Sequence, residues 1–168
     1  MIWDGAPHNA FTDLVRWRDQ FYCAFREGEG HAGDLGKLRI LRSGDGSDWE
    51  SVGLISLDGY DLRDAALSIT PEDRLLLLGG AQQTGDKGRM TGTVVSTSDD
   101  GIGWSVPMAV TDPGRWLWRI TWHENDAYGV SYATPEGKPW SQLLKSHDGL
   151  RFEIVQPELS GDGWPTEA

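Results

Sequence analysis

The sequence predicts an all-β fold, a β-propeller built from four-stranded antiparallel blades. The first observation is a phrase, Ser-x-Asp-Gly-x-x-aromatic, that begins at Ser43, Ser98 and Ser146, with starts 55 and 48 residues apart. The second is that each copy follows a run of aliphatic or β-branched residues, as a strand would. A repeat of about 50 residues that couples a strand, a turn and an aromatic residue is typical of propeller blades.

The residue types in the phrase suit a tight turn. Asp and Ser side chains accept hydrogen bonds from nearby backbone N–H groups, and Gly adopts the positive φ that such turns require. The closing aromatic residues, Trp49, Trp104 and Phe152, offer large apolar surfaces for packing between neighbouring sheets. We therefore interpret the repeated aspartates as structural residues rather than catalytic ones.

Cutting the chain at equivalent points gives three similar units. The first has expected strands at 11–17, 20–25, 37–42 and 51–57, and the second at 65–69, 74–78, 90–96 and 106–110. The third has expected strands at 119–123, 127–132, 141–145 and 153–155. We expect one partial propeller over 1–168, with blades at about 6–58, 61–112 and 116–160 and a fourth starting at 164–168.

The spacing also predicts a register between the first two units. Asn9 precedes Ser43 by 34 residues, and Asp64 precedes Ser98 by the same number. On that spacing, His8-Asn9 corresponds to Arg63-Asp64.

The composition argues against two classes of partner, nucleic acids and membranes. The 168 residues carry a net charge of −11, which disfavours nucleic acid because its phosphates would be repelled. No apolar run approaches the ~18 residues of a membrane span, so we expect no membrane partner. No signal-peptide pattern is visible, which slightly favours the cytoplasm while leaving the compartment open.

Cys23 alternates with aromatic residues and is expected to be a small core residue rather than a nucleophile.

The phrase resembles the Asp box of sialidases and related propellers, in a variant one residue shorter than usual. The stretches at 6–14, 25–28 and 60–64 are similar to bacterial sialidase-like proteins, and the resemblance runs over nearly the whole chain. It implies six blades, of which this sequence holds about three. We expect the chain to be the amino-terminal half of a longer protein, with closure of a six-blade ring by a homodimer as the alternative.

The resemblance further implies where a site would lie. Inner strands begin at the mouth of the central channel, the second-to-third strand loops open on the same face, and the Asp boxes lie on the opposite rim. The polar residues that this places at the mouth are His8, Asn9, Arg26, Glu27, Glu29, His31, Asp61, Arg63, Asp64, Trp118, Arg119 and Glu167.

Roles follow from side-chain chemistry. Glycoside cleavage commonly needs two carboxylates, and the candidates are Asp64 first, then Asp61 and Glu27. Guanidinium groups match a carboxylate bidentately, so an arginine cluster suits an anionic sugar. The candidates for substrate binding are Arg26, Arg63, Arg119, His8, Asn9, His31 and Trp118. The alternative is that each arginine pairs with Glu27, Asp61 or Asp64 and holds the mouth together.

The match to the sialidase pattern departs in detail. Phe25-Arg26-Glu27 stands where Arg-Ile-Pro is expected, and the Tyr nucleophile with its Glu would come from later blades. No metal motif or cofactor is indicated. We expect a sialidase-like glycoside hydrolase acting on an acidic or polar glycan, inactive as this chain alone. The alternative is a non-catalytic carbohydrate-binding or scaffold propeller.

Overall fold

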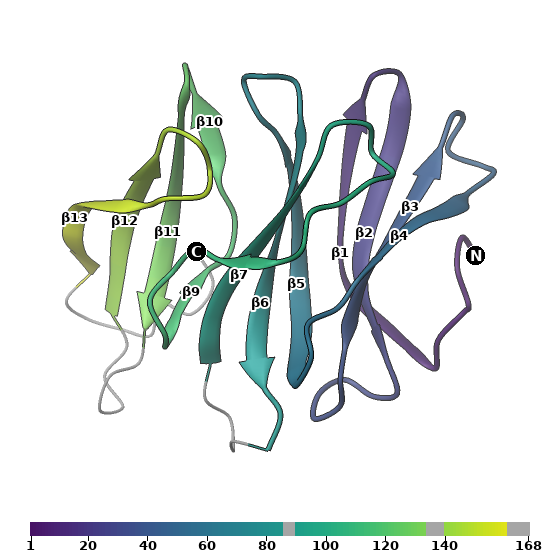
Figure 1. Cartoon of the computed structure of the whole chain (residues 1–168), viewed down its shortest axis with the longest axis horizontal. Coiled ribbons are helices and arrows are strands. Elements are labelled where there is room, and N and C mark those ends of the chain that lie inside the picture. The colour runs from purple at the N-terminus through teal and green to yellow at the C-terminus, as the bar shows by residue number, and fades with distance from the viewer. Residues whose placement is uncertain (86–89, 134–139, 161–168) are drawn as a thin grey trace.

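The computed structural model describes residues 1–85, 90–133 and 140–160, and these residues form three antiparallel sheets (Figure 1). The all-β class predicted from the repeats is therefore confirmed. The described residues contain no helix that could cross a membrane.

Each sheet corresponds to one of the predicted units. Sheet 1 has the order β1 (His8–Trp17), β2 (Gln20–Gly28), β3 (Lys37–Ser43), β4 (Glu50–Ile55). Sheet 2 has the order β5 (Tyr60–Ile69), β6 (Leu75–Gln83), β7 (Met90–Ser98), β8 (Met108–Ala109). Sheet 3 has the order β10 (Thr121–His123), β11 (Asp126–Ala133), β12 (Trp140–Ser146), β13 (Glu153–Ser160), with β9 (Arg115–Leu117) also paired to β11. The third inner strand, predicted as one piece at 119–123, is thus two short strands.

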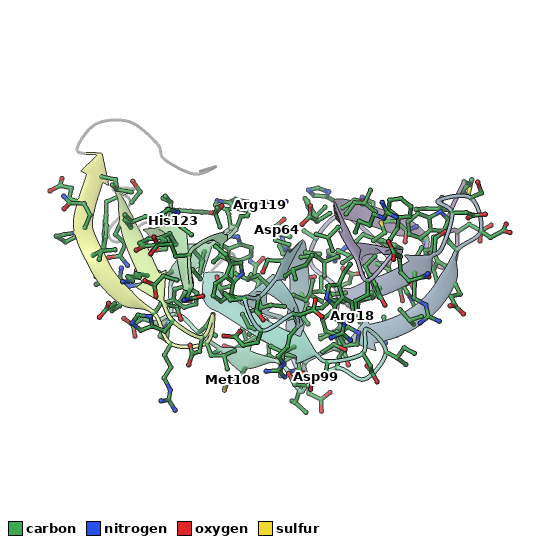
Figure 2. All side chains as sticks on the ribbon, turned by 90° about the horizontal axis from the view of Figure 1, so that it is seen from above. Arg18, Asp64, Asp99, Met108, Arg119 and His123 are labelled. Carbon is green, nitrogen blue, oxygen red and sulfur yellow. The ribbon has the colours of Figure 1, made fainter. Side chains whose placement is uncertain are left out.

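The three sheets fan out around a common axis. Seen from above, they form an open arc (Figure 2). Asp64 and Arg119 lie on the concave side, and Asp99 and Met108 lie on the convex side. The strand that begins each sheet order lies toward the concave side, so any shared site of the three sheets belongs there.

The core lies between the sheets, and β6 shows how the sequence builds it. Its four consecutive leucines are all buried, with at most 1% of each exposed. Leu75 and Leu77 pack in the core between sheets 1 and 2, whereas Leu76 and Leu78 pack in the core between sheets 2 and 3. Alternate side chains of a strand point to opposite faces, so a continuous apolar run fits a sheet covered on both sides.

The Ser-x-Asp-Gly turns have the predicted chemistry in all three sheets. In the second turn, Ser98 Oγ accepts a hydrogen bond from the N–H of Gly101 at 2.8 Å, and Asp100 Oδ1 accepts two more from residues 102 and 103. The turns at Ser43 and Ser146 repeat these contacts. The backbone N–H donors hold the pKa of the Asp100 carboxyl below its usual value.

These turns also join neighbouring sheets. Gly101 has a φ of +75°, and a Cβ added there would lie 2.2 Å from the hydroxyl oxygen of Tyr22 in sheet 1. Trp104 and Phe152 pack against the two inter-sheet cores, as predicted. Trp49 instead packs with Trp3 on the outer face of sheet 1, because no described sheet covers that face.

Cys23 lies in the same outer cluster and is buried and free, as the sequence predicted. Burial, with a smaller contribution from the charge of Asp13, raises the pKa of its thiol. A raised pKa disfavours the reactive thiolate, which agrees with a packing role.

The turn contacts can be tested with Ser98→Ala. This change should leave the buried Gly101 N–H without its acceptor and lower the free energy of unfolding by about 1–3 kcal/mol, measured by urea denaturation. The control is Ser47→Ala in the first turn, whose side chain is exposed, and it should change stability by about 0.5 kcal/mol or less. Equal effects of the two changes would contradict the structural role of the buried serine.

Candidate active site at the three inner strands

Each sheet has an inner strand: β1 in sheet 1, β5 in sheet 2, and β9 together with β10 in sheet 3. The three inner strands are interrupted at the same level. β1 loses register with β2 between residues 10 and 13, and β5 loses register with β6 between residues 63 and 66. In sheet 3, the gap between β9 and β10 spans residues 118–120. A bulge bends a strand and redirects its side chains, so three aligned irregularities can build one site.

This register corrects the spacing argument made from the sequence. Ala10 and Arg63 are the last paired residues before the two bulges, which makes Phe11 equivalent to Asp64. The predicted match of His8-Asn9 to Arg63-Asp64 was wrong by two positions. Ala10 precedes Ser43 by 33 residues, but Arg63 precedes Ser98 by 35. The difference arises because the second unit has one extra residue in its β5–β6 hairpin and one more in its β6–β7 hairpin.

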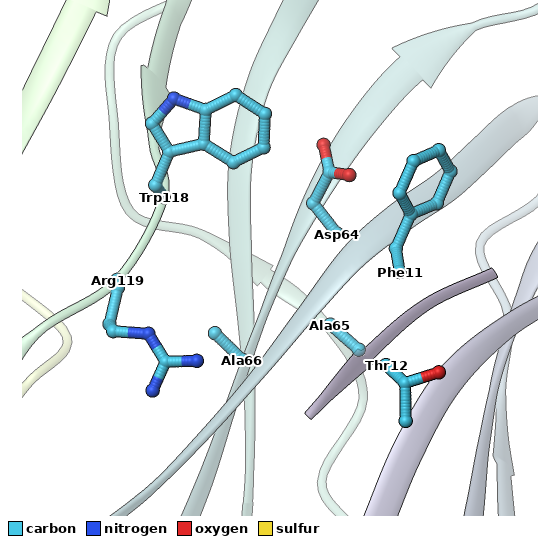
Figure 3. Close-up of a pocket in the computed structure, with 7 residues that line it drawn as sticks. All are labelled: Phe11, Thr12, Asp64, Ala65, Ala66, Trp118 and Arg119. Carbon is cyan, nitrogen blue, oxygen red and sulfur yellow. The ribbon is translucent and has the colours of Figure 1, made fainter. Parts of the chain in front are cut away.

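The residues at these interruptions line a pocket of about 490 Å³ (Figure 3). Its lining is Phe11 and Thr12 from β1, residues 64–66 from β5, and Trp118 with Arg119 from the β9–β10 link. Three of the predicted site residues, Asp64, Trp118 and Arg119, are therefore brought together.

Asp13 ties the three inner strands to one another. Its Oδ2 accepts a hydrogen bond from the backbone N–H of Leu67 in β5 at 2.8 Å. Its Oδ1 accepts one from Nη2 of Arg119, also at 2.8 Å. The carboxylate is only 12% exposed. Sequence reasoning missed this residue, although an acidic side chain inside an expected strand, directly before Leu14 and Val15, is a signal that could have indicated it.

The two pocket residues from the β9–β10 link are held by different partners. The Arg119 side chain is 57% exposed, and its guanidinium is tethered by Asp13. The Trp118 ring stacks on Tyr132 at 6.0 Å and meets Trp116 edge-on at 5.8 Å. Together these contacts present a cation and an indole to the pocket.

Arg26, Asp61 and Arg63 form a separate network between sheets 1 and 2. Arg26 has no exposed surface and donates from Nε to Asp61 at 2.8 Å, from Nη1 to the carbonyl of Gly30 at 2.6 Å, and from Nη2 to Asp34. Arg63 donates to the other oxygen of Asp61. Burial acts to lower the pKa of Arg26, but the hydrogen bonds that it donates to Asp61 and Asp34 and the negative charges of these carboxylates outweigh burial and raise that pKa. For these residues the geometry matches the ion-pairing alternative.

The other predicted residues are not among the residues that line the pocket. Glu27 forms a bidentate pair with Arg39 at 2.8 and 2.9 Å. Asn9 donates to the backbone carbonyl of residue 6. The rings of His8 and His31 lie 5.4 Å apart. Glu167 lies outside the described residues, as does the expected start of a fourth blade at 164–168.

No group of three or more His, Cys, Asp or Glu side chains that could hold a metal ion occurs within the described part of the chain.

Three fanned antiparallel sheets with a pocket at their inner strands define a partial β-propeller. No family model and no curated protein matches the chain. Solved structures do match. A protein of unknown function from Dyadobacter fermentans has a TM-score of 0.74 and 20% identity, covering 91% of this chain and 56% of that one.

Two glycoside hydrolases show the same likeness. An α-L-arabinofuranosidase from Fusarium graminearum, solved with an iminosugar inhibitor, has a TM-score of 0.71 and 13% identity, covering 92% of this chain and 50% of that one. A family 117 glycoside hydrolase from Zobellia galactanivorans has a TM-score of 0.66 and 12% identity, covering 87% and 54%. The chain therefore shares the fold of β-propeller glycoside hydrolases and spans about half the length of these three structures. The narrower resemblance to sialidases stays a prediction.

Because Asp13 accepts hydrogen bonds from both Leu67 and Arg119, we expect removal of Asp13 to cost more stability than removal of Arg119. Asp13→Ala should lower the free energy of unfolding by about 2 kcal/mol, because the amide of Leu67 loses its acceptor next to the core. Arg119→Ala removes only the exposed half of the contact and should cost about 0–1 kcal/mol. Urea denaturation of both variants tests this, and an equal or larger loss for Arg119→Ala would contradict it.

Proposed function

We propose that the chain forms the sugar-binding inner surface of a propeller glycoside hydrolase, with the substrate at the pocket of the three inner strands. The observation that carries this proposal is the meeting of a carboxylate, a guanidinium and an indole, from Asp64, Arg119 and Trp118, in one pocket. A pocket of about 490 Å³ falls in the usual range for small-molecule sites, ~300–1,000 Å³.

Each group has a specific task in this proposal. Asp64 acts as a catalytic carboxylate, Arg119 binds an anionic substituent of the sugar, and Trp118 packs against the ring. An acidic glycan of the sialate or uronate type is the favoured substrate. Asp61, Arg26 and Arg63 act indirectly, because their charges are engaged with one another between sheets 1 and 2.

The carboxylate count decides what the chain can do by itself. Asp64 is the sole carboxylate among the described pocket-lining residues, whereas glycoside cleavage commonly uses a pair about 5–9.5 Å apart. The other two candidates, Glu27 and Asp61, do not line the pocket, and each forms an ion pair with an arginine. We therefore propose that this chain binds sugar without cleaving it, and that the second catalytic group belongs to surfaces outside these three sheets.

The same observation keeps a second candidate function in view. A propeller that binds carbohydrate without any hydrolysis also needs the guanidinium and the indole but not a second carboxylate. The two functions differ in whether the carboxylate of Asp64 contributes to turnover once the site is complete.

Sugar binding is tested by saturation-transfer NMR on the chain with three probes: N-acetylneuraminic acid, glucuronic acid and methyl α-galactoside. Arg119→Ala should weaken binding of the two acids about tenfold, the effect of losing about 1.4 kcal/mol of charge-assisted hydrogen bonding. Asp64→Asn should strengthen binding of the acids relative to the neutral probe, because it removes a like charge from the pocket.

The matched control is Arg151→Ala, an exposed arginine at the third turn, which should leave all three affinities unchanged. Absence of binding by the unaltered chain would refute the proposed function. Release of fluorophore from a methylumbelliferyl sialoside by this chain alone would refute the requirement for a second group.

A further inference from the structure

Phe11 occupies a backbone conformation that its side chain does not favour. Its φ is +58°, in the left-handed region, where a bulky residue is an outlier. The equivalent bulge of β5 holds Asp64 at a φ of +54°, and Asp tolerates this region through its short polar side chain. The bulge itself therefore does not require an aromatic residue, and strain of this kind concentrates at functional sites.

The ring of Phe11 is held in place by a loop. It lies 5.2 Å from the ring of His31, which comes from the loop at residues 29–36 between β2 and β3. That loop is fixed by Arg26, which binds the carbonyl of Gly30 and the carboxylate of Asp34. The packing thus fixes the ring position while leaving the ring only half-buried at the pocket.

The position of Phe11 complements that of Trp118. Both line the pocket, and in the view of Figure 3 Asp64 lies between them. A sugar that presents a hydroxyl or glycosidic oxygen to Asp64 would have aromatic surface on either side. The C–H groups of a sugar ring form apolar patches that pack favourably on aromatic rings.

We propose that Phe11 is a specificity-determining residue, an apolar subsite that packs against the C–H face of the bound sugar. The inference rests on the proposed function and adds to it the selection of pyranose rings with a continuous apolar face. It explains why a strained aromatic residue stands where the equivalent bulge holds an aspartate.

The decisive variant is Phe11→Gly, which relieves the strained φ and removes the ring. Binding of methyl α-galactoside, measured by saturation-transfer NMR, should fall at least tenfold. The urea midpoint of unfolding should stay the same or rise, because relief of the left-handed conformation offsets the lost contact with His31. A residue kept only for packing would show the opposite pattern, a lower midpoint and unchanged binding.

The matched control is Asp19→Gly, which relieves a φ of +60° at the other end of β1, where the side chain is 93% exposed. It should preserve or raise the urea midpoint and leave binding unchanged. Phe11→Tyr keeps an aromatic ring and should restore at least half of the affinity. Phe11→Asn, with a residue that tolerates positive φ, replaces the glycine variant if that variant does not fold.

The outcomes separate this inference from the proposed function. If the unaltered chain binds none of the three probes, the proposed function fails and the subsite fails with it. If the chain binds sugar and Phe11→Gly binds equally well, or if Phe11→Tyr does not restore affinity, the subsite alone is wrong.

Discussion

The carboxylate of Asp13 is the contact on which the concave side of the molecule depends. It accepts a backbone N–H from β5 and a guanidinium N–H from the β9–β10 link, while belonging to β1 itself. Inner strands of a fan have one edge that no neighbouring strand covers, and their N–H groups need other acceptors. One side chain meets that need and fixes the height of three strands relative to one another. The pocket forms where those strands are interrupted, so its shape follows from this alignment.

Apolar and charged contacts form separate clusters between the sheets. Between the sheets, leucines from both faces of β6 form apolar cores that hold the fan together. A charged network also lies between sheets 1 and 2, where the buried Arg26 donates hydrogen bonds to Asp61, Asp34 and a backbone carbonyl. A buried ion pair of this kind contributes little net stability, but breaking it would be costly, which makes it suited to fixing a loop. The loop that it fixes is the one that holds His31 against Phe11.

Much of the fold was accessible from the sequence because its signals are local. The Ser-x-Asp-Gly turns form from contacts within four residues, so their chemistry was predicted correctly in all three sheets. The predicted register of the first two units was wrong because the distance from turn to bulge depends on hairpin length. The β5–β6 and β6–β7 hairpins are each one residue longer than the β1–β2 and β2–β3 hairpins. Residues whose partners lie in a neighbouring sheet were harder still to predict. For Arg26 the sequence left substrate binding and ion pairing both open, and only tertiary packing shows that Asp61 and Asp34 are its partners. Asp13 was missed because its partners lie 54 and 106 residues away.

Hydrogen exchange of the Leu67 amide tests the alignment of the inner strands most directly, because Asp13 accepts that N–H at the concave edge. We predict slow exchange in the unaltered chain and at least tenfold faster exchange in Asp13→Ala, which removes the acceptor oxygen, with the amide of Leu77 in the central strand β6 protected in both. Equal exchange rates for Leu67 in the two proteins would show that the three inner strands are aligned by something other than this carboxylate.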